Sequence, residues 1–197
     1  GEVSVELALR VGKTLATCLA ALHDKGIVHR DIKPANVFIE ARGDIRLLDM
    51  GIARLVDEEG PTKTGMILGS LWYLAPESVR CAKTTSAVDV YALGVTLAEA
   101  FANKPLFDRW QERQVQFLGE RAKGRLGFQI SDTVPREYQP IIAQLTHNLP
   151  EERPKTKQEL ANLWVEKRVV TKNPPKRRQN PVAAMFVLML IVVCGII

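Results

Sequence analysis

Four side chains between positions 31 and 49 have types and spacings that suit chemistry on a phosphate group. Asp31 and Asp49 are carboxylates, Asn36 offers a neutral side-chain oxygen, and Lys33 adds a cation two residues after Asp31. Carboxylate and amide oxygens are hard ligands of the kind that Mg²⁺ takes beside phosphate groups. Singly, each oxygen donor has a plainer reading as a turn acid, a helix cap or the start of an Asp-x-Gly turn. The spacing of the whole set therefore decides between the readings.

The same residues lie in three short motifs that follow one another in a fixed order. Residues 29–36 read His-Arg-Asp-Ile-Lys-Pro-Ala-Asn, residues 49–51 read Asp-Met-Gly, and residues 75–77 read Ala-Pro-Glu. These motifs resemble the catalytic loop, the magnesium-binding motif and the end of the activation segment in protein kinases. The chain is thus similar to the eukaryotic-like Ser/Thr protein kinases of the bacterial receptor (transmembrane) type.

The resemblance implies a role for each residue of the first two motifs. Asp31 is expected to accept the proton of the substrate hydroxyl, and Lys33, a mark of Ser/Thr specificity, to lie beside the transferred phosphate. Asn36 and Asp49 are expected to hold Mg²⁺ and, through it, ATP. Met50 replaces the usual Phe of the Asp-Phe-Gly motif, and its flexible apolar side chain can fill the same hydrophobic slot. ATP and Mg²⁺ are the expected cofactors.

Residues 49–77 resemble an activation segment. Thr62 and Thr64 lie where receptor-type bacterial kinases carry a pair of phosphorylated threonines. Arg30, beside the catalytic Asp, supplies a cation that a phosphothreonine can pair with through charge-assisted hydrogen bonds. We therefore expect activation by phosphorylation, with solvated loop threonines as the alternative.

Two acids and an arginine resemble buried supports of the kinase fold. Glu77 and Arg153 match an ion pair that fixes the end of the activation segment, where losing one partner costs about 3–5 kcal/mol. Asp89 matches a helix acid that holds the backbone of the catalytic loop. An ordinary exposed acid would be out of place in so apolar a helix.

Three further residues are expected to support the site without taking part in the reaction. His29 is expected to be a packed, structural histidine, because Asp31 already fills the role of base. Gly51 completes the Asp-Met-Gly motif. Ser70 occupies the usual Thr position of the loop that flanks the substrate hydroxyl, and it keeps a hydroxyl that can hydrogen-bond Asp31 and Lys33.

Helices and one hairpin are expected to position these residues. Apolar residues recur at helical spacing over residues 4–25. Strands at 37–40 and 45–48 are joined by a short loop that contains Gly and Asp, which predicts a hairpin that brings the two magnesium ligands together. Residues 50–72 have no clear period and are expected to form a long loop. Further helices are expected after residue 76 and over residues 86–102, 108–122, 137–148 and 156–168.

The resemblance covers residues 1 to about 168 and corresponds to the C-terminal lobe of the kinase fold. The expected fold is mainly α with a small β-hairpin, as part of the α+β kinase family. Neither the Gly-rich loop nor the third-strand Lys and its Glu partner has a match in this sequence, so the N-terminal lobe is absent. We therefore expect a kinase fragment that is inactive by itself, from an active parent enzyme. The alternative is a membrane-tethered pseudokinase or binding module.

The charge and hydropathy of the last thirty residues differ from those of the rest. The net charge of +5 owes much to the run 167–178. Residues 169–181 are expected to be a basic, proline-containing juxtamembrane linker. Residues 182–197 contain no charge and would cover roughly 24 Å as a helix, less than a roughly 30 Å hydrocarbon core. We expect a truncated transmembrane helix, with a buried core helix as the alternative.

These features predict a single-pass membrane protein and its partners. Basic residues before the apolar helix place the kinase lobe in the cytoplasm. Protein substrates, ATP and a homodimer for phosphorylation in trans follow from the resemblance. Nucleic acid is not expected, because the basic linker lacks aromatic stacking residues, and anionic lipid headgroups explain its charge better. The cysteines, at positions 18, 81 and 194, show no metal-ligand spacing and no disulfide framework.

Overall fold

The computed structural model describes residues 3–48, 68–80, 85–104 and 106–164. The chain divides into two compact units, Gly1–Glu166 and Lys167–Ile197, and all described residues lie in the first. The predicted linker and terminal helix therefore lie outside the described residues. Within those residues, no helix combines the length and the apolar character needed to cross a membrane.

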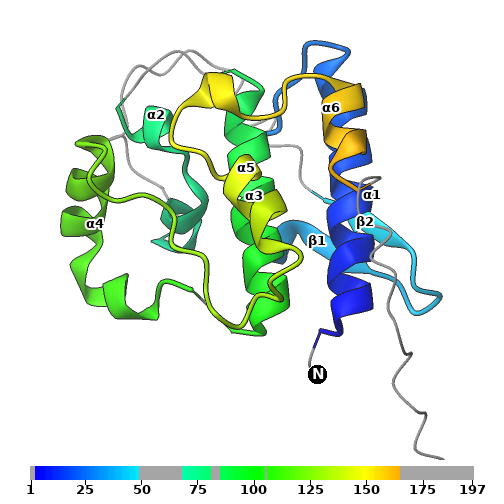
Figure 1. Ribbon diagram of the computed structural model, residues 1–197, viewed down its shortest axis with the longest axis horizontal. Helices are drawn as coiled ribbons and strands as arrows, with labels where there is room; N and C mark the ends of the chain where they lie inside the picture. Colours follow the sequence, from blue (N-terminus) through cyan, green and yellow to red (C-terminus); the bar gives the residue numbers. More distant parts are fainter. Residues whose placement is uncertain (1–2, 49–67, 81–84, 105, 165–197) are drawn as a thin grey trace, which may run out of the picture. The chain divides into compact units, whose positions relative to one another are not determined.

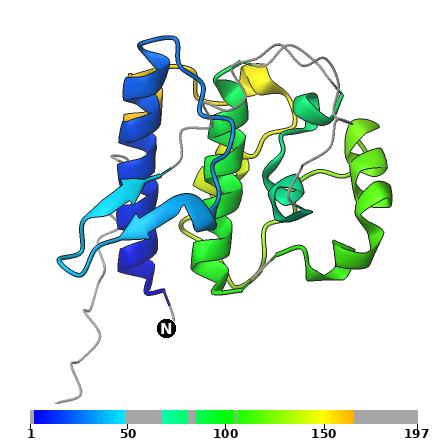
Figure 2. The same ribbon diagram turned by 180° about the vertical axis from the view of Figure 1, so that it is seen from behind.

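Helix α1 and a β-hairpin lie side by side at one edge of this unit (Figures 1 and 2). Helix α1 spans Val5–His23, and its N-cap Ser4 accepts a hydrogen bond from the Leu7 backbone N–H at 3.1 Å, as N-cap serines do. Strands β1 (Val37–Ile39) and β2 (Ile45–Leu47) pair antiparallel. The predicted hairpin is confirmed, and the turn between its strands uses a glycine in the left-handed region.

Helix α3 is the centre of the core. It spans Ala87–Ala102 and is buried on nearly all sides, which is typical of a central helix. It packs on α1 and on α5 (Gln139–Leu145). Gly94 allows the close approach of α5, because a Cβ at that position would lie 2.7 Å from the Cβ of Leu145.

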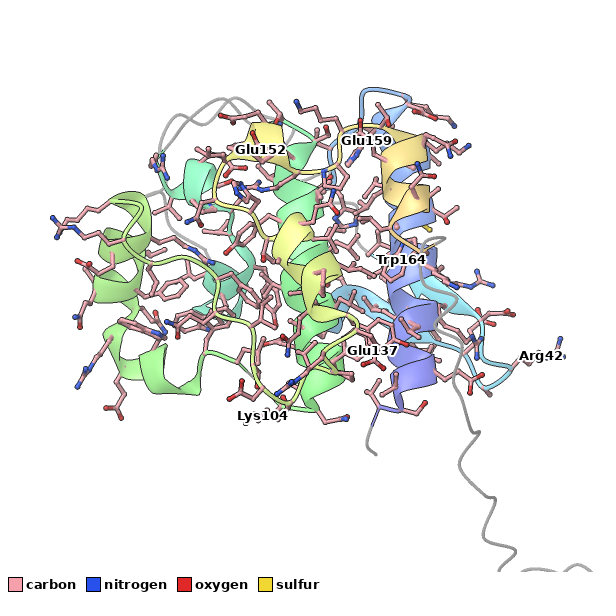
Figure 3. The ribbon with its side chains drawn as sticks, viewed as in Figure 1. Arg42, Lys104, Glu137, Glu152, Glu159 and Trp164 are labelled. Carbon is pink, nitrogen blue, oxygen red and sulfur yellow. The ribbon has the colours of Figure 1, made fainter. Side chains whose placement is uncertain are left out.

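Shorter helices complete the unit. Helix α2 (Pro76–Val79) and helix α4 (Gln114–Ala122) contact each other on the far side of α3 from α1 (Figures 1 and 2). Helix α6 (Lys157–Asn162) packs on α1. Trp164, labelled in Figure 3, follows α6 and reaches α1 at Gly12, where an added Cβ would lie 2.6 Å from the indole ring.

Two of the predicted segments differ from the structure, for the same physical reason. Residues 108–122 form a 3₁₀ helix over Asp108–Arg113 before α4 begins. The end of the predicted long loop 50–72 also lies in a 3₁₀ helix, which spans Leu68–Tyr73. In each case an aromatic side chain packs into the core: Trp110 lies edge-on to Phe117, and so does Trp72. Tertiary packing therefore decides the local structure there, a signal that hydrophobic periodicity does not carry.

The fold within the described residues is mainly α with one two-stranded sheet, as predicted. The helical ends differ from the predicted ones: α5, predicted over 137–148, spans Gln139–Leu145, and α6, predicted over 156–168, ends at Asn162. Pro140 lies in the first turn of α5, a position where proline favours a helix start because its missing N–H is not needed there.

Candidate active site

The loop that carries Asp31 has a strained backbone held by one buried carboxylate. Arg30 has a φ of 67°, a conformation that costs of order 1–3 kcal/mol for a residue other than glycine. The side chain of Asp89 accepts the backbone N–H of His29 at 2.8 Å and that of Arg30 at 2.7 Å. The ring of His23 lies 2.8 Å from the same carboxylate. Helix α3 thereby imposes the turn that presents Asp31.

Asp31, Lys33 and Asn36 meet at a single carboxylate oxygen. Oδ2 of Asp31 accepts from Lys33 Nζ at 2.8 Å and from Asn36 Nδ2 at 2.9 Å. Nδ2 of Asn36 also donates to the Asp31 carbonyl at 2.7 Å. The Asp31 side chain is 25% exposed and that of Lys33 is 16% exposed. Two donors therefore fix the direction of a carboxylate that a substrate can still reach.

The hairpin places the residue before Asp49 next to Asn36. The Leu48 backbone N–H donates to the Asn36 carbonyl at 2.8 Å. Because the Asn36 amide nitrogen faces Asp31, the side-chain oxygen Oδ1 is directed elsewhere, and no hydrogen bond among the described residues engages it. Asn36 therefore offers the kind of neutral oxygen that a magnesium ion accepts.

His29 lies behind the loop. It is almost fully buried, and its Nδ1 accepts the backbone N–H of Asp31 at 3.3 Å. Its Nε2 is buried and has no hydrogen-bond partner within the described part of the chain. The position of the ring suits support of the loop better than contact with a substrate.

Glu77 and Arg153 form the ion pair expected from the sequence. The guanidinium donates to both carboxylate oxygens, at 2.6 Å and 2.9 Å. Arg153 also donates to the carbonyls of His147 at 2.7 Å and Ala87 at 2.9 Å. Bidentate pairs of this kind are among the stronger side-chain interactions. The pair ties α2 to the start of α3 and to the segment before α6.

Residues 2–165 match the protein kinase domain family. The chain belongs to this family. It is 38% identical over 157 residues to the Ser/Thr protein kinase PkaA of Streptomyces coelicolor, covering 78% of this chain and 28% of that protein. It is 31% identical over 160 residues to PrkC of Bacillus subtilis, covering 81% of this chain and 25% of PrkC.

A third relative gives the same picture. The chain is 35% identical over 135 residues to the Ser/Thr protein kinase PknL of Mycobacterium tuberculosis, covering 68% of this chain and 34% of PknL. The kinase chain described here thus spans about a quarter to a third of the length of these relatives. All three are named as Ser/Thr protein kinases.

Some of the other predicted site residues of this kinase chain lie wholly or partly outside the described residues. The backbone of Ser70 lies in the 3₁₀ helix Leu68–Tyr73, but its side chain is outside the described residues. The following residues also lie outside the described part of the chain: Asp49, Met50, Gly51, Thr62 and Thr64.

Sequence reasoning missed a buried arginine of the kinase chain. Arg121 of α4 is 1% exposed, and its Nη1 donates to the Trp72 carbonyl at 3.2 Å. Its Nη2 donates to the hydroxyl of Tyr91 in α3. Burial, together with the nearby positive charge of Arg153, lowers the pKa of Arg121 to about 9. The sequence of α4 gives no sign of this burial, since long basic side chains at helix ends usually reach into solvent.

Glu99 of α3 holds Tyr73, the residue after Trp72, by a hydrogen bond. The hydroxyl of Tyr73 donates to Oε2 of Glu99 at 2.5 Å, and Oε1 of Glu99 accepts the Leu106 backbone N–H at 3.1 Å. Burial and the Glu99 carboxylate raise the pKa of the Tyr73 phenol well above its usual range. The phenol therefore stays protonated and keeps donating throughout the physiological pH range.

Exposed apolar side chains border the site on the side of the hairpin. Phe38 of β1 follows Asn36 by two residues and is 52% exposed. Further large apolar side chains on neighbouring segments are also exposed: Ile27, Ile39 and Leu48. Phe38 and Ile39 are successive strand residues and point to opposite faces of the hairpin, so the exposed apolar side chain of Phe38 is the one directed away from the core-facing side of β1.

Proposed function

We propose that the protein containing this chain transfers the γ-phosphate of ATP to Ser or Thr hydroxyls of proteins. The observation that carries this proposal is the Asp31 carboxylate, held by Lys33 and Asn36 on a loop that Asp89 locks in a strained turn. Phosphoryl transfer depends on positioning and charge neutralisation more than on covalent chemistry. This arrangement supplies both.

In the proposed reaction, Asp31 accepts the proton of the substrate hydroxyl as that oxygen bonds to the γ-phosphorus. The bond from the γ-phosphorus to the bridging oxygen of ADP breaks, and ADP carries away that electron pair. Lys33, whose Nζ lies 2.8 Å from the Asp31 carboxylate, would pair with the transferred phosphoryl group. Oδ1 of Asn36 and the Asp49 carboxylate would hold Mg²⁺, which neutralises the charge of the ATP phosphates.

We also propose that this chain is the C-terminal lobe of the kinase domain. The exposed side chains of Phe38 and Leu48 suit an adenine ring and a second lobe, because burying apolar side chains of this size is favourable by about 1.5–3 kcal/mol each. A C-terminal lobe by itself offers ATP one wall only, so the chain alone is expected to be inactive.

The receptor arrangement belongs to the same proposal. Residues 169–181 would form a basic linker, and residues 182–197 would enter the membrane, with the kinase lobe on the cytoplasmic side. Phosphorylation of Thr62 and Thr64 in trans, within a homodimer, would activate the enzyme, with Arg30 as the cation that receives a phosphothreonine.

The experiment is a phosphoryl-transfer assay on the full-length protein with ATP, Mg²⁺ and a library of Ser/Thr peptides. Asp31→Asn is expected to lower kcat at least a hundredfold, a loss typical of a general base, and a matched Asp24→Asn change at the end of α1 is expected to have no effect. Tight ATP binding without transfer would replace this proposal with the pseudokinase alternative.

A further inference from the structure

Both the ring and the backbone of Trp72 are held by side chains of α4. The Trp72 ring stacks on Phe107 at a centroid distance of 5.6 Å and meets the edge of Phe117 at 4.9 Å. Its carbonyl accepts from Arg121 at 3.2 Å. Phe117 and Arg121 are four residues apart on α4, so they lie on the same face of the helix. Movement of Trp72 would therefore break contacts with one helix on two sides.

The guanidinium of Arg121 is surrounded by aromatic rings. Its carbon lies 5.0 Å from the ring centre of Tyr91, 4.8 Å from that of Phe117 and 6.0 Å from that of Phe107. Cation–π contacts of this kind offset part of the lost hydration. Within the described ranges no carboxylate pairs with Arg121. A buried cation without a directly paired carboxylate is costly for a fold.

A bound small molecule does not explain this burial. The cavity beside Arg121, bordered also by Trp110 and Phe128, has a volume of about 30 Å³. That volume is room for about one water molecule and excludes an organic ligand. The groups that Arg121 serves are therefore the protein groups it contacts, the Trp72 carbonyl and the Tyr91 hydroxyl.

We propose that Arg121 is a positioning residue for the protein substrate, acting by fixing the Trp72 carbonyl and thus the shape of the segment Leu68–Tyr73. This inference rests on the proposed function and on the predicted place of Ser70 in the loop that flanks the substrate hydroxyl. Glu99 of α3 holds the neighbouring Tyr73. Side chains of both α3 and α4 therefore hold the segment by hydrogen bonds. Of these side chains, Arg121 belongs to none of the sequence motifs.

A purely structural role predicts a different response to substitution. Methionine has a similar length to the buried part of Arg121 and fills the same space without desolvating a charge, so the desolvation cost that is removed offsets the two hydrogen bonds that the substitution loses. The inference therefore predicts that Arg121→Met leaves stability intact and weakens peptide recognition.

The test uses the full-length protein with two matched variants, Arg121→Met and Arg125→Met. Arg125 lies just beyond the same end of α4, is exposed, and makes no side-chain hydrogen bond or ion pair with the described residues. For Arg121→Met, we expect the KM for a Ser/Thr peptide to rise about tenfold, the size of one hydrogen bond from a charged donor. The KM for ATP should stay within twofold, and Arg125→Met should match the wild type in both.

Hydrogen exchange of the peptide 68–74 in the same proteins gives a readout independent of activity. Arg121→Met should speed exchange there, Arg125→Met should not, and Arg121→Lys, which keeps one donor, should fall between. Unchanged exchange and unchanged peptide KM in Arg121→Met would overturn the inference. So would a clear loss of thermal stability in Arg121→Met, because it would show a structural residue.

The two proposals fail in different ways. If the wild-type full-length protein transfers no phosphate, the proposed function is wrong, and the exchange experiment still shows whether Arg121 holds the segment. If the wild type is active and Arg121→Met changes neither the peptide KM nor the exchange, only the inference about Arg121 is wrong.

Discussion

Two buried arginines lie against the same tyrosine ring and have opposite electrostatic surroundings. The guanidinium carbons of Arg121 and Arg153 lie 5.0 Å and 4.9 Å from the ring centre of Tyr91. Arg153 is paired with Glu77 through two hydrogen bonds. Among the described residues, the hydrogen-bond acceptors of Arg121 are both neutral: the Tyr91 hydroxyl and the Trp72 carbonyl.

The charge of Arg153 therefore stabilises the fold through its pair with Glu77, whereas the charge of Arg121 adds a desolvation cost to the fold. Removing one partner of a buried pair leaves the other charge uncompensated, which is expensive. Removing an unpaired buried charge relieves a desolvation cost. Substitutions at the Glu77–Arg153 pair should thus lower the free energy of unfolding. Substitution of Arg121 should leave the free energy of unfolding nearly unchanged and should weaken peptide recognition.

The largest effect is expected for Glu77→Gln. It leaves Arg153 buried without its carboxylate and should lower the free energy of unfolding by about 3–5 kcal/mol, measured by urea unfolding of the purified protein. In Glu77→Gln/Arg153→Met, part of this loss should be recovered, because no unpaired charge remains. A loss below about 1 kcal/mol in Glu77→Gln would show that this pair is no stronger than an exposed one.

Asp89→Asn should come next. Asp89 is buried like Arg121, but two backbone N–H groups and a histidine ring satisfy it. The neutral amide weakens the hydrogen bonds that hold Arg30 in its strained conformation, so unfolding should become easier by about 1–3 kcal/mol. Phosphoryl transfer should fall at least tenfold, because Asp31 follows Arg30 directly. Transfer at the wild-type rate would show that the turn at Arg30 does not need this carboxylate.

The sequence predicted the parts of the site that depend on short motifs and strong periodicity. The hairpin, the central helix α3 and the Glu77–Arg153 pair are present as predicted. The roles assigned to Asp49, Thr62 and Thr64 remain predictions, since these residues lie outside the described part of the chain.

Arg121 could not be predicted, and the reason is physical. Its two acceptors are a main-chain carbonyl 49 positions away and a tyrosine hydroxyl 30 positions away. Neutral acceptors leave no charge pattern in a sequence. The inward turn of residues 68–73 depends on Trp72 packing against Phe107 and Phe117, contacts that no local propensity encodes.

The pH dependence of stability sharpens the comparison further. Burial lowers the pKa of Arg121 to about 9 in the folded chain, well below its ordinary value, so above pH 9 the folded state binds fewer protons than the unfolded state. The stability of the folded state therefore rises with pH from about pH 9 up to the ordinary pKa of arginine. The charged or titratable groups facing Arg121 are Arg153, Glu77 and Tyr91.

The unfolding free energies of the wild type and of Arg121→Met are measured at pH 8 and at pH 10, and the difference between the two proteins is compared at the two pH values. Titrations common to both proteins cancel in this difference. The wild type should gain about 1 kcal/mol relative to the variant, since one pH unit past a shifted pKa is worth about 1.4 kcal/mol. No change in this difference would show that Arg121 stays charged and that its neutral neighbours solvate it well.

The smallest effect is expected for Tyr91→Phe. The ring that both arginines contact is retained, and only the hydroxyl that accepts from Arg121 is lost. One neutral acceptor is worth about 1 kcal/mol, so urea unfolding should shift by that amount. In the Arg121→Met background, Tyr91→Phe should cost clearly less, because the guanidinium that donates to the hydroxyl is already gone. In the Glu77→Gln background, Tyr91→Phe should cost as much as in the wild type. An equal cost in the Arg121→Met and Glu77→Gln backgrounds would show that the hydroxyl does not distinguish the two arginines.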